Sequence, residues 1–174
     1  KHYWPKAETF TDIKEFNAEK YKGKIDIITG GFPCQPFSKS GSQLGFADKV
    51  RGTLFEVIRE IVEIREPDFI ILENVPNILK HDNGRTIRII KGAFGELNYH
   101  TWETILSPHD FGIAQHRPRA FIVGIRERVR GYRSFTWPET QDVATHVETL
   151  RDPSCDHEDI TESQYEVFEH WSNL

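Results

Sequence analysis

One cysteine lies in a segment that could hold it as a nucleophile. Cys34 follows a short apolar run, Lys24–Thr29, and two glycines, and it is flanked by Pro33 and Pro36. Because proline fixes one backbone angle and lacks an N–H, this loop should be stiff, as an accurately placed reacting group requires. A thiolate there could attack an electrophilic carbon. The competing interpretation is a buried cysteine that only fills space, which is the commoner role of this residue.

A carboxylate follows the next apolar run along the chain. Glu73 comes directly after Asp68–Leu72, where a side chain could act as a general acid. It could equally cap the end of a strand, and its position alone does not decide between the two roles. Asn74 and Val75, which follow it, are expected to be architectural rather than catalytic.

Basic side chains gather between residues 115 and 133. Arg117 and Arg119 could bind oxygen atoms of a base or a phosphate, because the guanidinium group offers several donors in a fixed plane. The same run could be a solvated face of the protein. We favour that interpretation, or loose contact with phosphate, for the stretch from Arg126 to Arg133.

The apolar pattern predicts the elements that must position these residues. Buried strands are expected at 24–29 and 68–72, further strands at 100–106 and 120–125, a closing strand at Phe135–Pro138, and helices over Thr53–Arg65 and from Gly84–Arg85 onward. Strands that alternate with helices indicate an α/β fold with a mostly parallel sheet. Because ligands bind at the carboxyl ends of such strands, the segments after Thr29 and Leu72 should carry the chemistry.

The composition excludes several classes of protein. The chain has 174 residues, of which 37% are hydrophobic and 28% charged, as in a globular domain. No apolar run approaches the roughly 20 residues of a membrane span, so no membrane partner is expected. The two cysteines, Cys34 and Cys155, are far apart and neither belongs to a C-x-x-C pair, so neither a disulfide framework nor a metal site is predicted. A reducing, cytoplasmic location fits best.

Several of these motifs together resemble a known family. Pro33–Ser38 resembles the catalytic loop of the cytosine-5 DNA methyltransferases. The companion blocks occur in the family's order: Thr11–Ile13, Asp48–Phe55, Glu73–Val75, Phe94–Tyr99 and Gln115–Arg119. The resemblance covers roughly residues 10–138 and implies a Rossmann-like, S-adenosylmethionine-dependent methyltransferase fold.

The resemblance assigns roles to the candidate residues. Cys34 would add to carbon 6 of cytosine, which makes carbon 5 nucleophilic enough to take a methyl group. Glu73 would donate a proton at ring nitrogen 3. Arg119 would hold the exocyclic oxygen of the base, and Arg117 would steady Glu73 or a phosphate. The target base would be flipped out of the duplex.

The resemblance also implies a cofactor and a nucleic-acid partner. The methyl group would come from S-adenosylmethionine, with Asp12 facing its adenine and Pro33 and Leu54 packing against it, although core packing explains Leu54 nearly as well. Double-stranded DNA is the expected partner. Its contacts would come from Gln35, Ser38, Ser40 and Gln115.

The sequence departs from the family at both ends. It lacks the glycine-rich cofactor loop, the acidic residue that holds the ribose, the target-recognition domain and the final family blocks. We therefore expect a fold incomplete at both ends, with a partial catalytic domain over residues 1–138 and an acidic segment over 139–174 that leads toward the recognition region. Alone, the chain should bind the cofactor weakly and methylate little. A second chain or a missing segment would complete the cofactor pocket.

Other functions compete with DNA methylation in bacterial or phage modification, where the protein would be associated with the nucleoid. One is transfer-RNA cytosine-5 methylation, although Phe32 and Ser38 in the loop favour the DNA branch. Another is a non-catalytic relic or a regulatory partner of a methyltransferase. A thiol hydrolase would need His109 or His116 as the base for Cys34, which the block pattern does not suggest.

Overall fold

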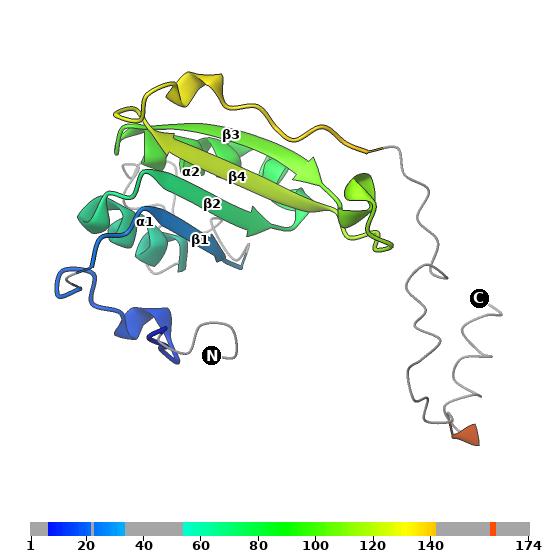
Figure 1. Cartoon of the computed structure of the whole chain (residues 1–174), viewed down its shortest axis with the longest axis horizontal. Helices are drawn as coiled ribbons and strands as arrows, with labels where there is room; N and C mark the ends of the chain where they lie inside the picture. Colours follow the sequence, from blue (N-terminus) through cyan, green and yellow to red (C-terminus); the bar gives the residue numbers. More distant parts are fainter. Residues whose placement is uncertain (1–6, 22, 34–53, 142–160, 163–174) are drawn as a thin grey trace.

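The described part of the chain folds around one four-stranded sheet (Figure 1). The structure is a computed structural model, which describes residues 7–21, 23–33, 54–141 and 161–162. The strands are β1 (Ile27–Gly31), β2 (Phe69–Asn74), β3 (Tyr99–Leu106) and β4 (Arg119–Arg126). The helices are α1 (Leu54–Arg65) and α2 (Arg85–Gly95), with 3-10 turns η1 (Ile13–Glu15), η3 (Pro76–Leu79), η4 (Pro108–Phe111) and η5 (Tyr132–Ser134). Both helices and the first four strands expected from the apolar pattern are confirmed.

The sheet is mixed, with strand order β1-β2-β4-β3. β1 and β2 are parallel and end side by side, since Gly31 is the register partner of Glu73. β4 lies between β2 and β3 and runs antiparallel to both. The α/β, Rossmann-like class expected from the sequence is confirmed. Within the described residues, parallel pairing is confined to β1 and β2, because residues 107–118 turn the chain straight back instead of crossing the sheet through a helix.

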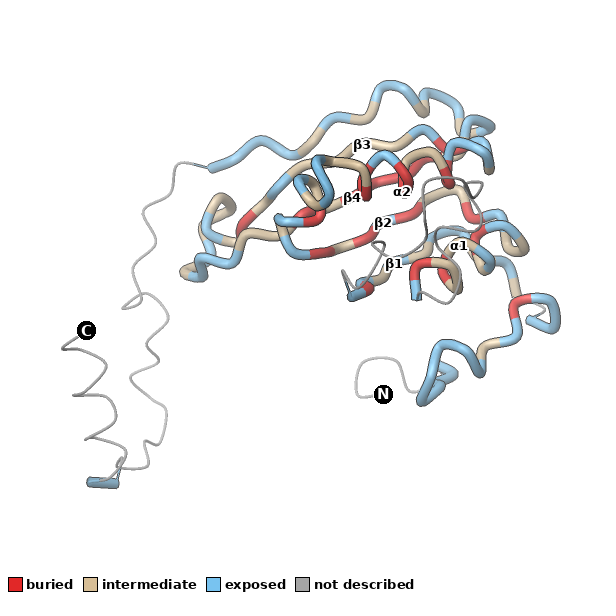
Figure 2. Tube along the Cα trace, turned by 180° about the vertical axis from the view of Figure 1, so that it is seen from behind, coloured by how far each residue is buried: buried red, intermediate tan, exposed pale blue. Residues whose placement is uncertain are grey.

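Both helices cover the same face of the sheet, as Figure 2 shows from that side. The rings of Phe55 in α1 and Phe94 in α2 lie 5.6 Å apart, and both side chains are fully buried. They pack in one cluster with Ile70 and Leu72 of β2 and Ile122 of β4. Each such side chain contributes about 1.5–3 kcal/mol when it leaves water. This core fixes the position of β2, on which the candidate site depends.

The opposite face of the sheet has no helix over it in the described part of the chain. Side chains alternate between faces along a strand, so Ile71 and Glu73 of β2 point away from the helices, as do Phe121 and Arg119 of β4. Ile71 remains 38% exposed on this face. A carboxylate and a guanidinium thus share the free face of the sheet.

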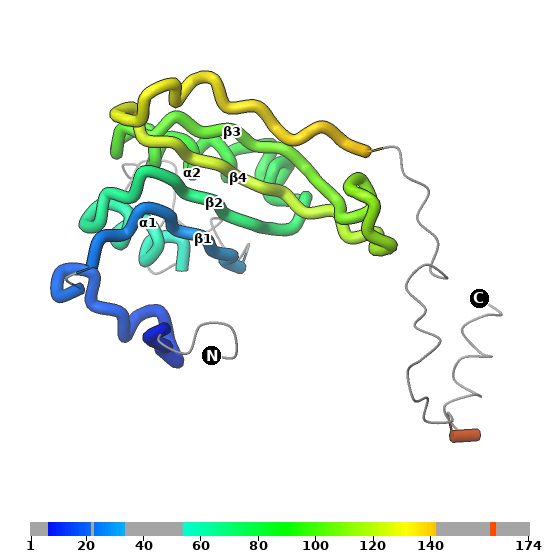
Figure 3. Tube along the Cα trace, viewed as in Figure 1, coloured from blue at the N-terminus to red at the C-terminus, as the bar shows by residue number. Residues whose placement is uncertain are grey.

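The sequence prediction of a closing strand at Phe135–Pro138 is wrong. These residues are extended but belong to no sheet. They are fastened by rings instead, because Phe135 packs 5.2 Å from Trp102 of β3 and 5.0 Å from Trp137. Figure 3 shows this segment running past β3, whereas the chain before β1 lies at the other edge of the sheet. Pro138 has no N–H to give to a ladder, which favours attachment through side chains.

Among the described residues, no helix is both long and apolar enough to cross a membrane.

Candidate active site

The candidate site is centred on an ion pair between two strands. Glu73 lies near the end of β2, and Arg119 is the first residue of β4. The Nε atom of Arg119 lies 2.7 Å from Oε1 of Glu73. The Glu73 side chain is 42% exposed and that of Arg119 is 23% exposed, so the pair faces open space rather than the core. Opposite charges at this distance attract each other and favour this mutual orientation of the two groups.

The neighbouring strand leaves room for the carboxylate. A Cβ atom added to Gly31 would lie 3.3 Å from Oε2 of Glu73, closer than ordinary van der Waals contact. Glycine at the end of β1 therefore lets the chain leave the sheet directly beside the carboxylate. Phe32 follows Gly31 directly, and Cys34 comes two residues after Phe32 in the sequence.

Asn74 ties the start of that loop to the end of β2. Its side chain is 4% exposed, and its Nδ2 group donates a hydrogen bond of 2.7 Å to the carbonyl oxygen of Phe32. Its Oδ1 atom accepts one of 2.9 Å from the N–H of Val75. The architectural role expected for Asn74 agrees with these contacts. The ends of β1 and β2 are thereby held as one unit.

A pocket of about 520 Å³ opens in front of the ion pair. Four residues predicted from the sequence share its wall: Glu73, Gln115, Arg117 and Arg119. The remaining wall is mostly apolar and comes from β3, β4 and the loop between them: Leu106, Ser107, Pro108, Phe111, Ile113 and Phe121. An apolar cavity with a few convergent polar groups is typical of a site for a small molecule.

The loop between β3 and β4 folds back on itself to form one side of this pocket. The N–H of His109 donates to the carbonyl oxygen of Gln115 at 3.0 Å, and the N–H of Ile113 donates to that of Pro108 at 3.1 Å. Gly112 adopts the left-handed conformation, φ 79°, in which the loop reverses. Gln115 and Arg117 are therefore carried by a folded loop and not by a free tether.

Sequence reasoning did not predict the six remaining lining residues, among them Ser107, Phe111 and Ile113. Ser107 is 5% exposed, and its Oγ atom accepts a hydrogen bond of 3.1 Å from the N–H of Arg117. The signal was available, because a serine three residues before an acid, directly after a strand, is typical of a capped turn. Nothing in the apolar periodicity points to Phe111 or Ile113.

The residues predicted to face the cofactor lie elsewhere. None of Asp12, Pro33 and Leu54 lines the pocket at Glu73. Leu54 is 36% exposed at the start of α1, and Pro33 is exposed beyond β1. The carboxylate of Asp12 caps η1 by accepting the N–H of Lys14 at 2.9 Å. All three therefore present side-chain surface to the outside.

The remaining predicted site residues lie outside the described residues: Cys34, Gln35, Ser38 and Ser40. The rings of His109 and His116, the alternative bases, lie 6.5 Å apart in the loop between β3 and β4. In the described part of the chain, no group of three or more histidine, cysteine, aspartate and glutamate side chains is arranged to hold a metal ion.

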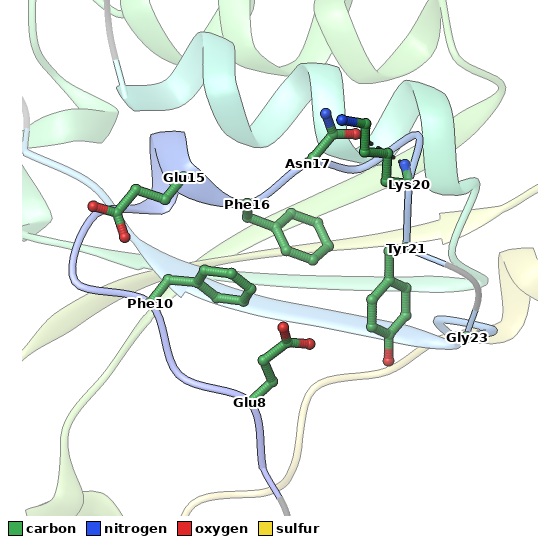
Figure 4. A pocket seen from close by; sticks show the side chains of 8 residues that line it. All are labelled: Glu8, Phe10, Glu15, Phe16, Asn17, Lys20, Tyr21 and Gly23. Atoms are coloured by element: carbon green, nitrogen blue, oxygen red, sulfur yellow. Dashed lines mark hydrogen bonds between the residues drawn. The ribbon is translucent and has the colours of Figure 1, made fainter.

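A second cavity, of about 450 Å³, lies in the segment before β1 (Figure 4). The ring of Phe16 packs 5.6 Å from that of Phe10 and 5.6 Å from that of Tyr21. Glu8 and Glu15 border the same space. None of the predicted site residues lines this cavity, so it is separate from the candidate active site.

The comparisons with known proteins agree with the geometry. A match to the family described as C-5 cytosine-specific DNA methylase extends over residues 1–173. The chain belongs to this family. The resemblance found in the sequence is thereby confirmed.

Two relatives within the family are similar over most of the chain. Type II methyltransferase M.SsoII of Shigella sonnei is 44% identical over 133 residues, which are 76% of this chain and 35% of that protein. Type II methyltransferase M.HhaI of Haemophilus parahaemolyticus is 38% identical over 149 residues, 86% of this chain and 45% of that protein. The chain thus spans about a third to a half of the relatives it matches. The description of the family itself names DNA, in agreement with the DNA branch that the loop residues favour.

Two solved structures with the same fold come from eukaryotes. Spodoptera frugiperda DNMT2, in a triple mutant, superposes with a TM-score of 0.58 at 22% identity and covers 93% of this chain and 49% of its own. Schizosaccharomyces pombe Dnmt2 gives 0.53 at 18% identity, over 83% and 45%. At this identity the likeness concerns the methyltransferase fold alone.

Proposed function

We propose that this chain carries the catalytic centre of a DNA cytosine-5 methyltransferase of bacterial or phage DNA modification. The observation that carries the proposal is the Glu73–Arg119 ion pair, which faces an open pocket beside the start of the Cys34 loop. The protein would act on double-stranded DNA in the cytoplasm, associated with the nucleoid. The bacterial origin of the type II relatives supports this setting.

The reaction divides into steps that these residues can perform. The thiolate of Cys34 adds to carbon 6 of a flipped-out cytosine, and the C5–C6 electron pair becomes available at carbon 5. Glu73 places a proton at ring nitrogen 3, which neutralises the charge that develops in the ring. Carbon 5 would then attack the methyl carbon of bound S-adenosylmethionine, and the electron pair of the broken C–S bond would leave on the thioether sulfur of S-adenosylhomocysteine. A water molecule acting as base would take the proton from carbon 5, the electron pair of that C–H bond would re-form the C5–C6 double bond and expel the Cys34 thiolate, and nitrogen 3 would return its proton to Glu73.

The guanidinium groups have separate tasks in this proposal. Arg119 keeps the carboxyl group of Glu73 in place through its Nε atom. Its Nη1 group donates to the carbonyl oxygen of Pro118 at 2.9 Å, and its remaining donors would bind the exocyclic oxygen of the base. Arg117 lines the same pocket, but the ion pair of Glu73 is with Arg119. Arg117 binds a phosphate of the DNA backbone instead. Gln115 contacts the DNA from the same loop, and Gln35, Ser38 and Ser40 do so from the Cys34 loop.

S-adenosylmethionine, when bound, supplies the electrophilic methyl group. Asp12, Pro33 and Leu54 fit a cofactor with apolar ring faces and polar edges, because all three are exposed and one oxygen atom of Asp12 remains beyond the bond to Lys14. They would hold the adenosine part. Pro33 directly precedes Cys34 and so links the cofactor side to the thiol.

We propose further that a second chain or an additional segment completes the cofactor pocket. In the described residues β1 pairs only with β2, so its outer edge is free. Ile27 on that strand is 53% exposed. An apolar groove of about 500 Å³ runs beside it, lined by Phe10, Ile13 and Ile61 among others. A free edge beside exposed apolar side chains favours a further strand, because such a surface is costly to leave in water.

Covalent capture tests the catalytic proposal. The chain is mixed with S-adenosylmethionine and with duplex DNA that contains 5-fluorocytosine, both alone and together with the parts of M.SsoII that lie outside the matched region. Fluorine at carbon 5 blocks the final elimination, so a turnover leaves the DNA bonded to Cys34. We expect a denaturant-resistant adduct in the complemented mixture that is absent with Cys34→Ser. Failure of the folded, complemented protein to form any adduct would reject the catalytic proposal.

Calorimetry tests the proposal about the cofactor pocket. The chain alone should bind S-adenosylmethionine weakly, and the complemented mixture should bind it at least tenfold more tightly, a gain of roughly 1.4 kcal/mol. Tight binding by the 174 residues alone would overturn the idea that the pocket needs a further segment.

A further inference from the structure

Buried polar side chains are few in the described part of the chain, and two of them lie at the candidate active site. Asn74, Thr86 and Ser107 are the buried polar residues there. Asn74 holds the start of the Cys34 loop through the carbonyl oxygen of Phe32. A buried polar group that fastens a loop is costly to remove, because its partner is left unpaired. Ser107 fastens a second loop, on the other side of the pocket, by accepting a hydrogen bond from the N–H of Arg117.

Ser107 joins the two ends of the loop between β3 and β4. It directly follows β3, and its Oγ atom accepts the N–H of Arg117, ten residues further on, at 3.1 Å. Arg119, two residues beyond, begins β4 and pairs with Glu73. The hydroxyl group therefore fixes the backbone just before the guanidinium that meets the catalytic carboxylate.

Asp110 holds Ser107 in place from within the same turn. Its Oδ2 atom accepts the N–H of Ser107 at 2.9 Å, and its own N–H donates to the Ser107 carbonyl oxygen at 3.0 Å. The carbonyl oxygen of Asp110 accepts the N–H of Gln141 at 2.7 Å. The aromatic contact of Phe135 with Trp102 anchors the segment that leads to Gln141. We call the hydrogen bonds among Ser107, Asp110 and Arg117 the brace. It is connected to β3 directly at Ser107 and, through the segment from Phe135 to Gln141, at Trp102.

We propose that Ser107 is a positioning residue, whose hydroxyl group holds the loop so that Arg117 and Arg119 face the pocket together. It acts through the backbone of Arg117 and takes no part in the chemical steps. This inference rests on the proposed function, since it names what positions the residues of that same site.

The variants that test it remove one buried hydroxyl group at a time. Ser107→Ala removes the acceptor of the Arg117 N–H. Ser107→Thr keeps an acceptor at the same place. Thr86→Val is the matched control, because Thr86 is 1% exposed and its hydroxyl group lies 2.7 Å from Nδ1 of His81, away from the pocket.

Amide hydrogen exchange measured by NMR reads the brace directly and needs no catalytic activity. We expect the Arg117 N–H to exchange about tenfold faster in Ser107→Ala, since a local opening that costs less free energy is populated more often. Ser107→Thr should restore slow exchange, and Thr86→Val should leave the Arg117 N–H as in the wild type. Equal exchange of the Arg117 N–H in Ser107→Ala and Thr86→Val would overturn the brace.

The covalent-capture assay on the complemented protein then tests the link to the chemistry. At saturating DNA, adduct formation should slow at least about tenfold in Ser107→Ala, recover in Ser107→Thr and stay unchanged in Thr86→Val. Faster exchange of the Arg117 N–H with an unchanged adduct rate would overturn positioning. A wild-type protein that forms no adduct would instead reject the proposed function, which the exchange measurement distinguishes because it does not depend on catalysis.

Discussion

Strands β2 and β4 carry a carboxylate–arginine arrangement at each of their two ends, and the two arrangements differ in what faces them. At one end, Glu73 and Arg119 form a single ion pair in front of a pocket of about 520 Å³. At the other end, Glu66 and Asp68, just before β2, pair with Arg126 and Arg128 at and just beyond the end of β4. Of these four, Glu66 and Arg126 border a cavity of about 130 Å³. The same residue types at the two ends therefore differ in what surrounds them.

At the Glu66 end, which we call the closed end, the charged groups pair with one another. Arg126 Nη2 lies 2.6 Å from Glu66 Oε1, and its Nη1 group donates to the Glu66 carbonyl oxygen at 3.1 Å. Arg128 donates to the same carbonyl oxygen at 2.8 Å and to Asp68 at 2.8 Å. The hydrogen bond from Arg126 holds the pKa of Glu66 below its usual value. These hydrogen bonds join the start of β2 to the end of β4. Because Arg126 and Arg128 spend most of their N–H donors on them, few remain to bind a ligand.

The comparison teaches that an ion pair becomes a candidate catalytic pair when it is incompletely satisfied and faces a cavity. Within the described residues Glu73 pairs with one arginine and lines a pocket of about 520 Å³, whereas Glu66 pairs with two arginines. Substitutions at the two ends should therefore separate catalysis from stability.

The largest expected effect is that of Glu73→Gln on catalysis. Glutamine keeps the shape of the side chain but cannot donate the proton as the acid does, so adduct formation in the complemented capture assay should fall by about 10²–10⁴-fold. Glu66→Gln is the matched control at the other end and should leave the adduct rate unchanged. Equal losses in the two variants would show that the two ends do not differ as described.

Arg119→Lys should produce the next largest effect. Lysine keeps the charge but loses the Nε contact of 2.7 Å to Glu73 and the planar set of donors, so the adduct rate should fall about 10²-fold. Arg126→Lys, made at the closed end, should change the adduct rate less than twofold. A full rate in Arg119→Lys would mean that charge alone suffices at the pocket.

Asn74→Ala is expected to affect stability. It leaves the Phe32 carbonyl oxygen and the Val75 N–H without their partner, which should cost about 1–3 kcal/mol in urea unfolding. Asn17→Ala removes an exposed side-chain hydrogen bond to the Lys20 N–H and should cost less than about 0.5 kcal/mol. Similar costs for the two variants would contradict the buried tie between β1 and β2.

Tyr99→Phe gives the smallest effect, at the closed end and only in part of the pH range. The phenol donates to the Pro67 carbonyl oxygen, and its loss should cost about 1 kcal/mol at neutral pH. Burial raises the pKa of Tyr99 to about 12 in the folded protein, above its ordinary value of 10.0. The phenol's contribution is therefore complete below pH 10 and is lost as the pH rises toward 12. The difference in unfolding free energy between wild type and variant should shrink over that interval, and a constant difference would contradict the assignment.

Much of the fold follows from local pattern. The apolar spacing of Phe55, Ile58 and Val62 predicts α1, and these side chains are its buried face. The position of Glu73 beside the end of β1 follows from two parallel strands that end together. Which arginine pairs with Glu73 could not be predicted from the local pattern. Arg117 and Arg119 are two residues apart in the sequence, and only the register of β4 shows that Arg119 is the one that meets Glu73.

What the sequence could not predict depends on contacts between distant residues. The insertion of β4 between β2 and β3 is a pairing choice that apolar runs do not encode. Phe135–Pro138 resembles a strand in composition, but it is attached to β3 by the contact of Phe135 with Trp102 and not by backbone hydrogen bonds of a sheet. The acid three residues after Ser107 indicates a capped turn, but the acceptor role of Ser107 toward Arg117 exists only in the folded loop.

The antiparallel course of β4 has a consequence for insertions and deletions. Because side chains alternate between the faces of a sheet, one residue added within the pairing of β4 with β2 would exchange the faces of Arg119 and its neighbour Ala120, and the guanidinium would turn toward the helices. Length variation among natural homologues should therefore stop abruptly at the first residue of the strand.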